Sequence, residues 1–197
     1  MPMLILHTGV ENLSWGPPVW TCRAQPPWTV QEGDLVQAEL FRTYGGIQTQ
    51  QQMAVATKPV HSLTQELADI ARRSYEVGLE ALRRGKTFGE VYEAMKEPIS
   101  EAGCWHLTPL IHSINPLMYI SPRAVGLDQR PEIKDYPGVG TIEGRLIEFP
   151  CLPGMIFQRE AKACRGKSRV NIGGTVAVTE DGVEELNELS TEMRIAE

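Results

Sequence analysis

A glycine pair between two strand-like stretches predicts a β-hairpin early in the chain. Residues 33–41 and 47–56 are strand-like, and Tyr44-Gly45-Gly46 lies between them. Glycine adopts the positive backbone φ angles that tight hairpin turns require. If the turn centres on Tyr44 and Gly45, Glu39 lies directly opposite Gln50, and we expect these two side chains to share a site.

Two amphipathic helices are predicted after this hairpin, at residues 62–85 and 87–103. Each begins with a capping box, in which an N-cap hydroxyl and a nearby glutamate or glutamine satisfy each other's backbone groups. The capping-box pairs are Ser62 with Gln65 and Thr87 with Glu90. Each helix ends at a glycine, Gly85 or Gly103, and Pro98 is expected to kink the second helix.

Strand-like segments dominate the rest of the chain. Residues 1–32 are rich in proline and tryptophan, which favours extended segments and turns over helix. Residues 122–141 contain several prolines and glycines and are predicted to form a long surface loop. The remaining predicted strands are residues 107–114, 145–149, 155–163 and 170–179, with a last short strand after a turn at 180–182. This order of elements predicts one α+β domain over residues 1–197, with a curved, mainly antiparallel sheet and helices on one face.

Size and charge argue against several classes of function. A chain of 197 residues suits a single domain. The net charge of -6 argues against a nucleic-acid partner, because binding a phosphate backbone requires clustered lysine and arginine. No apolar run is long enough to cross a bilayer and the first residues lack a secretion signal, so we expect a cytoplasmic protein without a membrane partner. The cysteines show no C-x-x-C spacing and indicate neither a zinc site nor a redox pair.

Several short motifs, taken in order, resemble one known family. The motifs are Glu32-Gly-Asp-Leu-Val36, Gly85-Lys-Thr-Phe-Gly-Glu90, Pro153-Gly-Met-Ile-Phe157 and Thr175-Val-Ala-Val-Thr-Glu-Asp-Gly-Val183, with Tyr44 and Gly46 in the hairpin turn. The chain resembles the C-terminal catalytic portion of the pita-bread family, which includes methionine aminopeptidases, prolidases, X-prolyl aminopeptidases and creatinase. The resemblance implies a pita-bread fold for a core at residues 33–190, truncated at its N-terminus.

The resemblance also implies a set of site residues. In metal-dependent members of the family, two aspartates, one histidine and two glutamates hold a pair of divalent ions. The first aspartate corresponds to Glu39, the histidine to His112 and the first glutamate to Glu160. The second aspartate and the last glutamate, which bridge the two ions in the family, correspond to Gln50 and Gly173.

The loss of both bridging carboxylates argues against a dinuclear metal site. Two dications about 3.5 to 4 Å apart repel each other strongly and need anionic bridges between them. Gln50 offers a neutral carbonyl oxygen, and Gly173 offers no side chain. We therefore expect no cofactor, with a single divalent metal on Glu39, His112 and Glu160 as the alternative.

Glu39, His112 and Glu160 are the candidate catalytic residues. For Glu160 the alternative is a structural ion pair with one of the nearby basic residues, which are Arg159, Lys162 and Arg169. Candidate substrate-binding residues are Gln48, Gln50 and Tyr119. The two glutamines share a strand face with Gln52, because side chains two residues apart on a strand point to the same side. The family's second active-site histidine has no counterpart in this chain, and Tyr119 is the residue nearest to its position. An exposed polar strand face is the alternative for the glutamines.

The resemblance leaves three functions open. The first is a family member with a decayed metal site that binds a small molecule or peptide without catalysis. The second is a metal-independent hydrolase of a small amide or C-N bond, with Glu160 or Glu39 as general base and His112 positioning or donating a proton. The third is a metal-dependent aminopeptidase acting on X-prolyl peptides. Because helices that precede this region in relatives are missing, part of the sheet would be uncovered, so we expect a homodimer or a partner chain.

Overall fold

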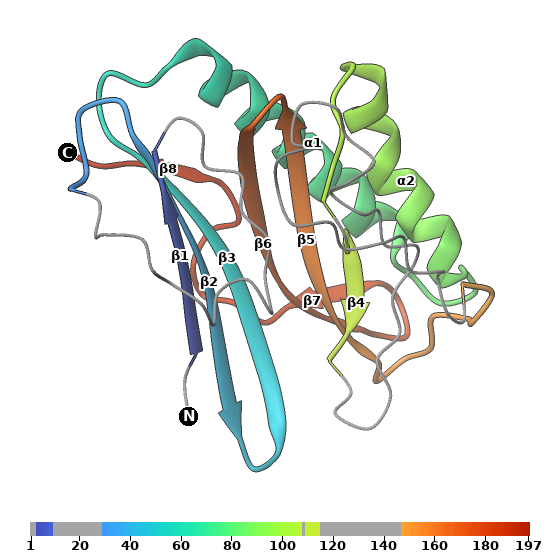
Figure 1. The fold of residues 1–197 in the computed structure, drawn as a ribbon. Coiled ribbons are helices and arrows are strands. Elements are labelled where there is room, and N and C mark those ends of the chain that lie inside the picture. Colours follow the sequence, from blue (N-terminus) through green and yellow to red (C-terminus); the bar gives the residue numbers. More distant parts are fainter. Residues whose placement is uncertain (1–2, 10–28, 108, 115–146) are drawn as a thin grey trace, which may run out of the picture.

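The computed structural model describes residues 3–9, 29–107, 109–114 and 147–197 (Figure 1). The described strands form one eight-stranded sheet. Its main path is β1 (Met3–Thr8), β2 (Leu35–Tyr44), β3 (Ile47–Ala56), β6 (Ser168–Val178), β5 (Ile156–Arg165) and β4 (Ile111–Ser113). The short β7 (Val183–Glu185) pairs with β6, and β8 (Met193–Ile195) runs parallel to β3. All other pairs are antiparallel, which confirms the predicted mainly antiparallel sheet.

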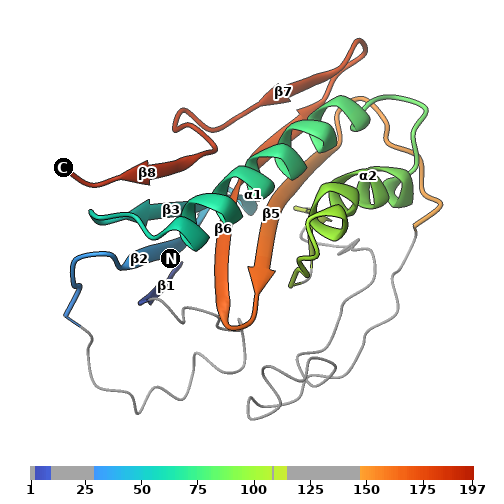
Figure 2. The same cartoon turned by 90° about the horizontal axis from the view of Figure 1, so that it is seen from above.

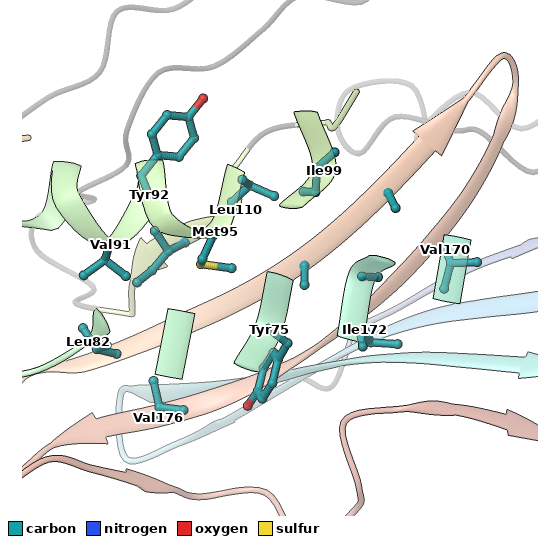
Figure 3. Close-up of a cluster of buried hydrophobic side chains, with 14 of the residues drawn as sticks. Tyr75, Leu82, Val91, Tyr92, Met95, Ile99, Leu110, Val170, Ile172 and Val176 are labelled. Carbon is teal, nitrogen blue, oxygen red and sulfur yellow. The ribbon is translucent and has the colours of Figure 1, made fainter. Parts of the chain in front are cut away.

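Two helices pack together on one face of this sheet. The helix α1 (Ser62–Ala81) packs against β5 and β6, and α2 (Phe88–Glu101) packs against α1 (Figure 2). Apolar side chains of both helices meet those of β5 and β6 in a buried core, part of which is drawn in Figure 3. The predicted α+β architecture, with helices on one face of the sheet, is therefore confirmed.

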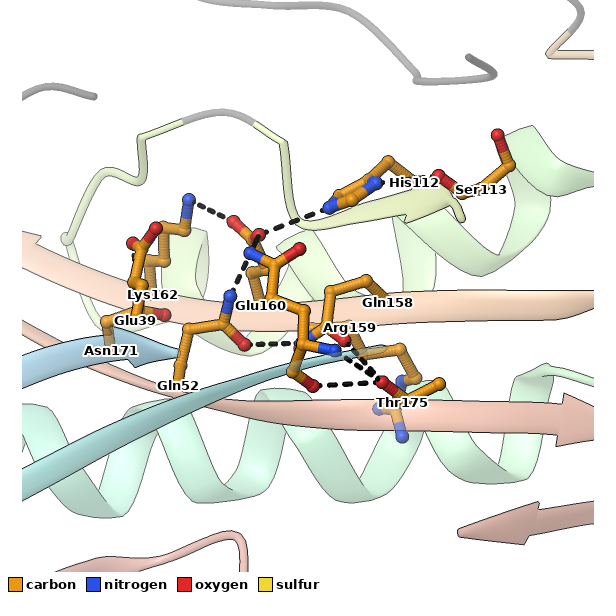
Figure 4. A network of polar contacts seen from close by, with 11 residues as sticks. Glu39, Gln52, His112, Ser113, Gln158, Arg159, Glu160, Lys162, Asn171 and Thr175 are labelled. Atoms are coloured by element: carbon orange, nitrogen blue, oxygen red, sulfur yellow. Dashed lines mark hydrogen bonds and ion pairs between the residues drawn. The ribbon is translucent and has the colours of Figure 1, made fainter. Parts of the chain in front are cut away.

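Alternation along β5 separates this core from a polar face. Ala161 and Ala163 are fully buried in the core beneath the helices. Because successive side chains of a strand point to opposite faces, Glu160 and Lys162 point away from α1 (Figure 4). The centre of the sheet thus carries mainly apolar residues on the helix side, with Arg159 as a buried exception, and charged residues on the other side.

The hairpin register differs from the prediction by two residues. Both residues of the Gly45-Gly46 pair have positive φ angles, 56° and 83°, so the turn centres on this pair and not one residue earlier. Glu39 consequently pairs with Gln52, and Phe41 pairs with Gln50. The predicted pairing of Glu39 with Gln50 is wrong, although all three polar side chains still share one face of the hairpin.

The helix ends confirm one predicted capping box and correct the other. Thr87 caps α2, because its Oγ1 accepts from the backbone N–H of Glu90 at 3.2 Å and the Glu90 side chain returns the contact. The N-cap of α1 is His61, which makes no side-chain cap, so Ser62 is already helical and the predicted box there is wrong. The helix also ends before Gly85, the residue predicted to cap it.

The later strands follow the prediction with shorter or shifted ends. Strand β4 covers only part of the predicted strand at 107–114, whereas β5 and β6 lie where strands were predicted. Residues 147–149 form no strand, contrary to the prediction, and the other two residues of that predicted strand lie outside the described residues. The predicted loop at 122–141 also lies outside the described residues.

Candidate functional site

Polar side chains from three strands converge on Glu160 (Figure 4). Gln50 and Gln52 come from β3, His112 from β4, and Glu160 and Lys162 from β5. All five side chains are buried, although each carries hydrogen-bonding groups. The sheet therefore places a polar cluster at its centre, where buried polar groups must satisfy one another.

Both oxygens of the Glu160 carboxylate are engaged by donors. Oε1 accepts from Nε2 of Gln50 at 2.7 Å and from Nε2 of Gln52 at 2.9 Å. The same oxygen lies 3.2 Å from Nε2 of His112. Oε2 forms an ion pair with Nζ of Lys162 at 2.5 Å. The cluster thus consists of one anionic acceptor surrounded by nitrogen atoms.

The surrounding groups keep Glu160 ionised. Burial by itself raises the pKa of Glu160, because the charge loses its solvation by water. The Lys162 ammonium and the hydrogen bond from His112 outweigh burial and lower the pKa to about 2. The carboxylate therefore carries its full charge at neutral pH.

The ring of His112 is oriented by the backbone beside it. Nδ1 lies 2.8 Å from the carbonyl oxygen of Ser113, and Nε2 lies 3.2 Å from Oε1 of Glu160. Both of these oxygens act only as acceptors, so a doubly protonated ring can donate to both. The ring is thereby directed with one nitrogen into the cluster.

A second carboxyl group, that of Glu39 on β2, lies beside the cluster. Its Oε1 accepts from Nδ2 of Asn171 at 3.0 Å, and the backbone N–H of Asn171 donates to Gln37 at 2.6 Å. Burial raises the pKa of Glu39, and the charge of Glu160 raises it further. The groups that act in the opposite direction are Lys162, Arg169 and His112. Glu39 is therefore protonated more readily than an exposed glutamate.

Side chains join β3 to β6 where the ladder between these strands is short. The two strands share the register pair Gln52 and Gly173. Next to it, Oγ1 of Thr175 accepts from the backbone N–H of Gln50 at 3.0 Å and lies 3.0 Å from Oε1 of Gln158. A threonine hydroxyl thus takes the place of a backbone carbonyl and links the sheet to the amide side chains of the cluster.

Gly173 is closely enclosed by its neighbours. A Cβ atom added at this position would overlap the backbone oxygen of Arg159 and would lie 2.7 Å from Oε1 of Gln52. Real Cβ atoms essentially never approach other atoms this closely. This backbone arrangement therefore leaves no room for a side chain at position 173.

Lys162 is the ion-pair partner of Glu160 among the basic residues considered from the sequence. Arg159, the residue before Glu160, points to the opposite face of the sheet. Its guanidinium lies 3.9 Å from the centroid of the Tyr75 ring on α1, and its Nη2 donates to the backbone oxygen of Tyr75. Arg159 therefore contacts the helix layer, whereas the next residue, Glu160, belongs to the polar cluster on the other face of the sheet.

The structure brings together some of the predicted site residues. Those in direct contact are Gln50, His112 and Glu160. Glu39 lies beside them, held by Asn171. Gln48 is only half-buried and lies closer to the hairpin turn, and Tyr119 lies outside the described residues.

Other members of the cluster were missed or weighed only as alternatives. Gln158, Glu160 and Lys162 alternate along β5, so the two-residue period could have placed all three on one face. Thr175 gave no such signal, because its contact with Gln50 joins strands that are far apart in the sequence.

Two further findings concern metal ligands and membranes. Among the residues that the structure describes, no group of three or more His, Cys, Asp or Glu side chains is arranged to hold a metal ion. Within the same residues, neither helix is long and apolar enough to cross a membrane.

Comparisons with known proteins identify the family and the fold. The family model of metallopeptidase family M24 matches residues 11–180, which is most of the chain. A search of curated protein sequences gave no match. The structure is similar to those of an X-Pro aminopeptidase from Thermotoga maritima (TM-score 0.69, 19% identity) and a prolidase from Pyrococcus furiosus (TM-score 0.69, 19% identity). It is also similar to a methionine aminopeptidase from Rickettsia prowazekii (TM-score 0.58, 18% identity).

These matches cover nearly all or most of this chain but smaller shares of the other proteins. The aminopeptidase match covers 98% of this chain but 49% of the Thermotoga protein, and the prolidase match covers 95% and 49%. The methionine aminopeptidase match covers 79% of this chain and 65% of that protein. The chain thus spans about half the length of the first two structures, and the likeness confirms the pita-bread fold.

Replacing Thr175 with valine is expected to weaken the junction between β3 and β6. Valine keeps the shape of threonine but lacks the hydroxyl, so the backbone N–H of Gln50 loses its acceptor. A buried donor left without a partner costs about 1 to 3 kcal/mol, and urea denaturation should show a loss of this size in the free energy of unfolding. The control Thr43→Val, at the exposed end of β2, should change it by less than about 0.5 kcal/mol. Equal losses in both variants would contradict the role given to Thr175.

Proposed function

Because this chain belongs to metallopeptidase family M24, we propose that it is a member whose former metal site now works without a dinuclear metal centre. In this proposal the Glu160 cluster binds a small polar molecule or a peptide and does not hydrolyse it. The single observation that carries the proposal is the occupation of both Glu160 oxygens by nitrogen donors.

The donor set around Glu160 does not suit a pair of divalent ions. A metal ion needs the carboxylate lone pairs that Gln50 and Lys162 already occupy. The ammonium group would also repel an incoming dication strongly in a buried site. At the position that the resemblance equates with a bridging glutamate, Gly173 has no side chain and no room for one.

The chemistry of the cluster favours a ligand that forms neutral hydrogen bonds. Gln50, Gln52 and Gln158 each carry an amide with two N–H donors and one acceptor oxygen, and in Gln50 and Gln52 the contact with Glu160 uses one of these donors. The charge of Glu160 is balanced within the cluster by Lys162, so an ionic ligand would find little net charge there. A peptide backbone or another amide-like group offers the matching pattern of donors and acceptors.

We expect the purified protein to retain no stoichiometric metal. After incubation with Mn²⁺, Co²⁺ or Zn²⁺ and desalting, elemental analysis should find far less than one ion per chain. The melting temperature should not rise with any of these ions, because a ligand that binds only the folded state would raise it. One or more ions retained per chain, together with metal-dependent cleavage of X-prolyl peptides, would replace this proposal with the aminopeptidase alternative.

A metal-independent hydrolase of a small amide or C-N bond is the second candidate. The observation that favours it is the contact between His112 and Glu160 at 3.2 Å. The low pKa of Glu160, about 2, makes it a weak base at neutral pH, because a good general base has a pKa near the working pH. The raised pKa of Glu39 suits the role of general base better, with His112 positioning or donating a proton.

A hydrolysis screen separates these two candidates. Our proposal predicts no turnover of X-Pro dipeptides or small amides by the wild-type protein. If turnover is found, it must be lost in His112→Ala and Glu39→Gln for the hydrolase candidate to hold. The control Glu76→Gln changes an exposed glutamate of α1, so turnover that belongs to this site should persist in that variant.

We further propose that two copies of this chain associate through an apolar patch on β1 and β2. Leu4 lies opposite Leu40 across the ladder, and Leu6 lies beside them. These leucines are 55%, 41% and 43% exposed. Leu40 follows Glu39 directly, so the patch lies on the sheet face opposite the carboxyl cluster. Contiguous exposed apolar residues of this kind mark association surfaces.

The homodimer predicts a mass of two chains in size-exclusion chromatography with light scattering. Leu40→Glu should shift this mass toward the monomer, because a charge in the patch opposes burial. The control Leu152→Glu, at a similarly exposed leucine away from β1 and β2, should leave the mass unchanged. A monodisperse wild-type monomer would reject this assembly and leave the proposal for the cluster unaffected.

A further inference from the structure

Lys162 and Glu160 form an ion pair within one strand, β5. The two residues are separated by one position on β5, so their side chains leave the same face of the strand. Nζ of Lys162 lies 2.5 Å from Oε2 of Glu160, and both residues are only 4% exposed. The pair is therefore enclosed in the sheet and largely shielded from water.

Glu160 requires a cation nearby, because hydrogen bonds alone do not neutralise a buried charge. The amides of Gln50 and Gln52 solvate Oε1 but carry no net charge. His112 contributes a positive charge only when its ring is protonated. Lys162 therefore supplies the constant positive charge that an ionised carboxylate needs in this environment.

The charge of Lys162 also acts on the second carboxyl group. Burial and the charge of Glu160 raise the pKa of Glu39, and Lys162 is the largest influence that lowers it. The ammonium group thus interacts favourably with carboxyl groups from two different strands, β2 and β5. In this respect it acts on the cluster as a single shared cation would.

We propose that the ammonium group of Lys162 is a built-in replacement for a bound cation, and that removing it turns the cluster into a site for an external cation. This inference rests on the proposed metal-free state of the wild-type site. The ligand expected in the vacated space is a primary alkylammonium ion, which has the same charge and the same hydrogen-bond donors as the Lys162 head group. It would meet the Glu160 carboxylate oxygen that Lys162 contacts in the wild-type protein.

The experiment compares the melting temperatures of Lys162→Ala and Lys162→Met with and without added cations. Loss of one partner from a buried ion pair is expected to lower the melting temperature by roughly 10 °C in a chain of this size. Added ethylammonium should restore much of this loss in Lys162→Ala, with a saturable dependence on concentration. Mn²⁺ should not restore it, because the described residues offer no group of three or more His, Cys, Asp or Glu side chains for a metal ion. In Lys162→Met the thioether chain fills the same space, so neither cation should have this effect.

Three controls make the rescue specific. Tetramethylammonium at equal ionic strength is too bulky and cannot donate hydrogen bonds, so it should not stabilise Lys162→Ala. Lys96→Ala removes an exposed lysine paired with Glu93, and its melting temperature should not respond to the cations. The double variant Glu160→Gln with Lys162→Met removes both charges, so it should melt above Lys162→Met and ignore the cations.

Each outcome bears on the inference. A melting temperature of Lys162→Ala equal to that of the wild type would overturn it, and so would the absence of any rescue by ethylammonium. If Lys162→Ala yields no folded protein, a folded double variant supports the inference and an unfolded one rejects it. Metal bound to the wild-type protein would instead reject the proposed function, so the two failures are distinguishable.

Discussion

A carboxylate at the centre of a β-sheet is the constraint on which the rest of this structure depends. Glu160 is buried and ionised, and such a group is costly unless opposite charge and hydrogen bonds surround it. Lys162 supplies the charge from the same strand, and Gln50 and Gln52 supply hydrogen bonds from β3. The need to solvate one anion thus links β5 to β3 across the strand that lies between them, β6.

The junction between β3 and β6 follows from the same need. Backbone pairing between these strands is short, and the amide side chains that reach Glu160 begin close to it. Thr175 completes the junction by accepting from the backbone of Gln50, the residue whose side chain donates to Glu160. Gln50 therefore couples the pairing of β3 with β6 to the geometry of the Glu160 cluster. Its backbone bonds to Thr175, and its side chain bonds to Glu160.

Local chemistry made much of the fold predictable, and long-range packing explains what was missed. The strand-forming segments and the capping box at Thr87 are recognised from residues that are close together in the sequence. Both features appear in the structure. The hairpin register was wrong by two residues because it depends on which residues adopt positive φ angles at the turn. The signature at Ser62 failed because the helix begins one residue earlier than a hydroxyl cap would require.

The same distinction applies to the site. Glu160 and His112 were identified through a family resemblance, whereas Lys162 was considered only as an alternative partner, although its spacing from Glu160 places both on one face. Contacts such as that of Asn171 with Glu39 join β6 to β2 and have no local signature in the sequence. Sequence reasoning therefore found the central acid more easily than the groups that neutralise and hold it.

The tight enclosure of Gly173 limits which amino acids this position can accept. A glutamate does not fit at this position without a backbone shift, because its Cβ would collide with the main chain of Arg159. Any side chain at position 173 requires β5 and β6 to move apart, which by itself weakens the protein. Any evolutionary path that places a carboxylate at position 173 would therefore pass through a less stable intermediate.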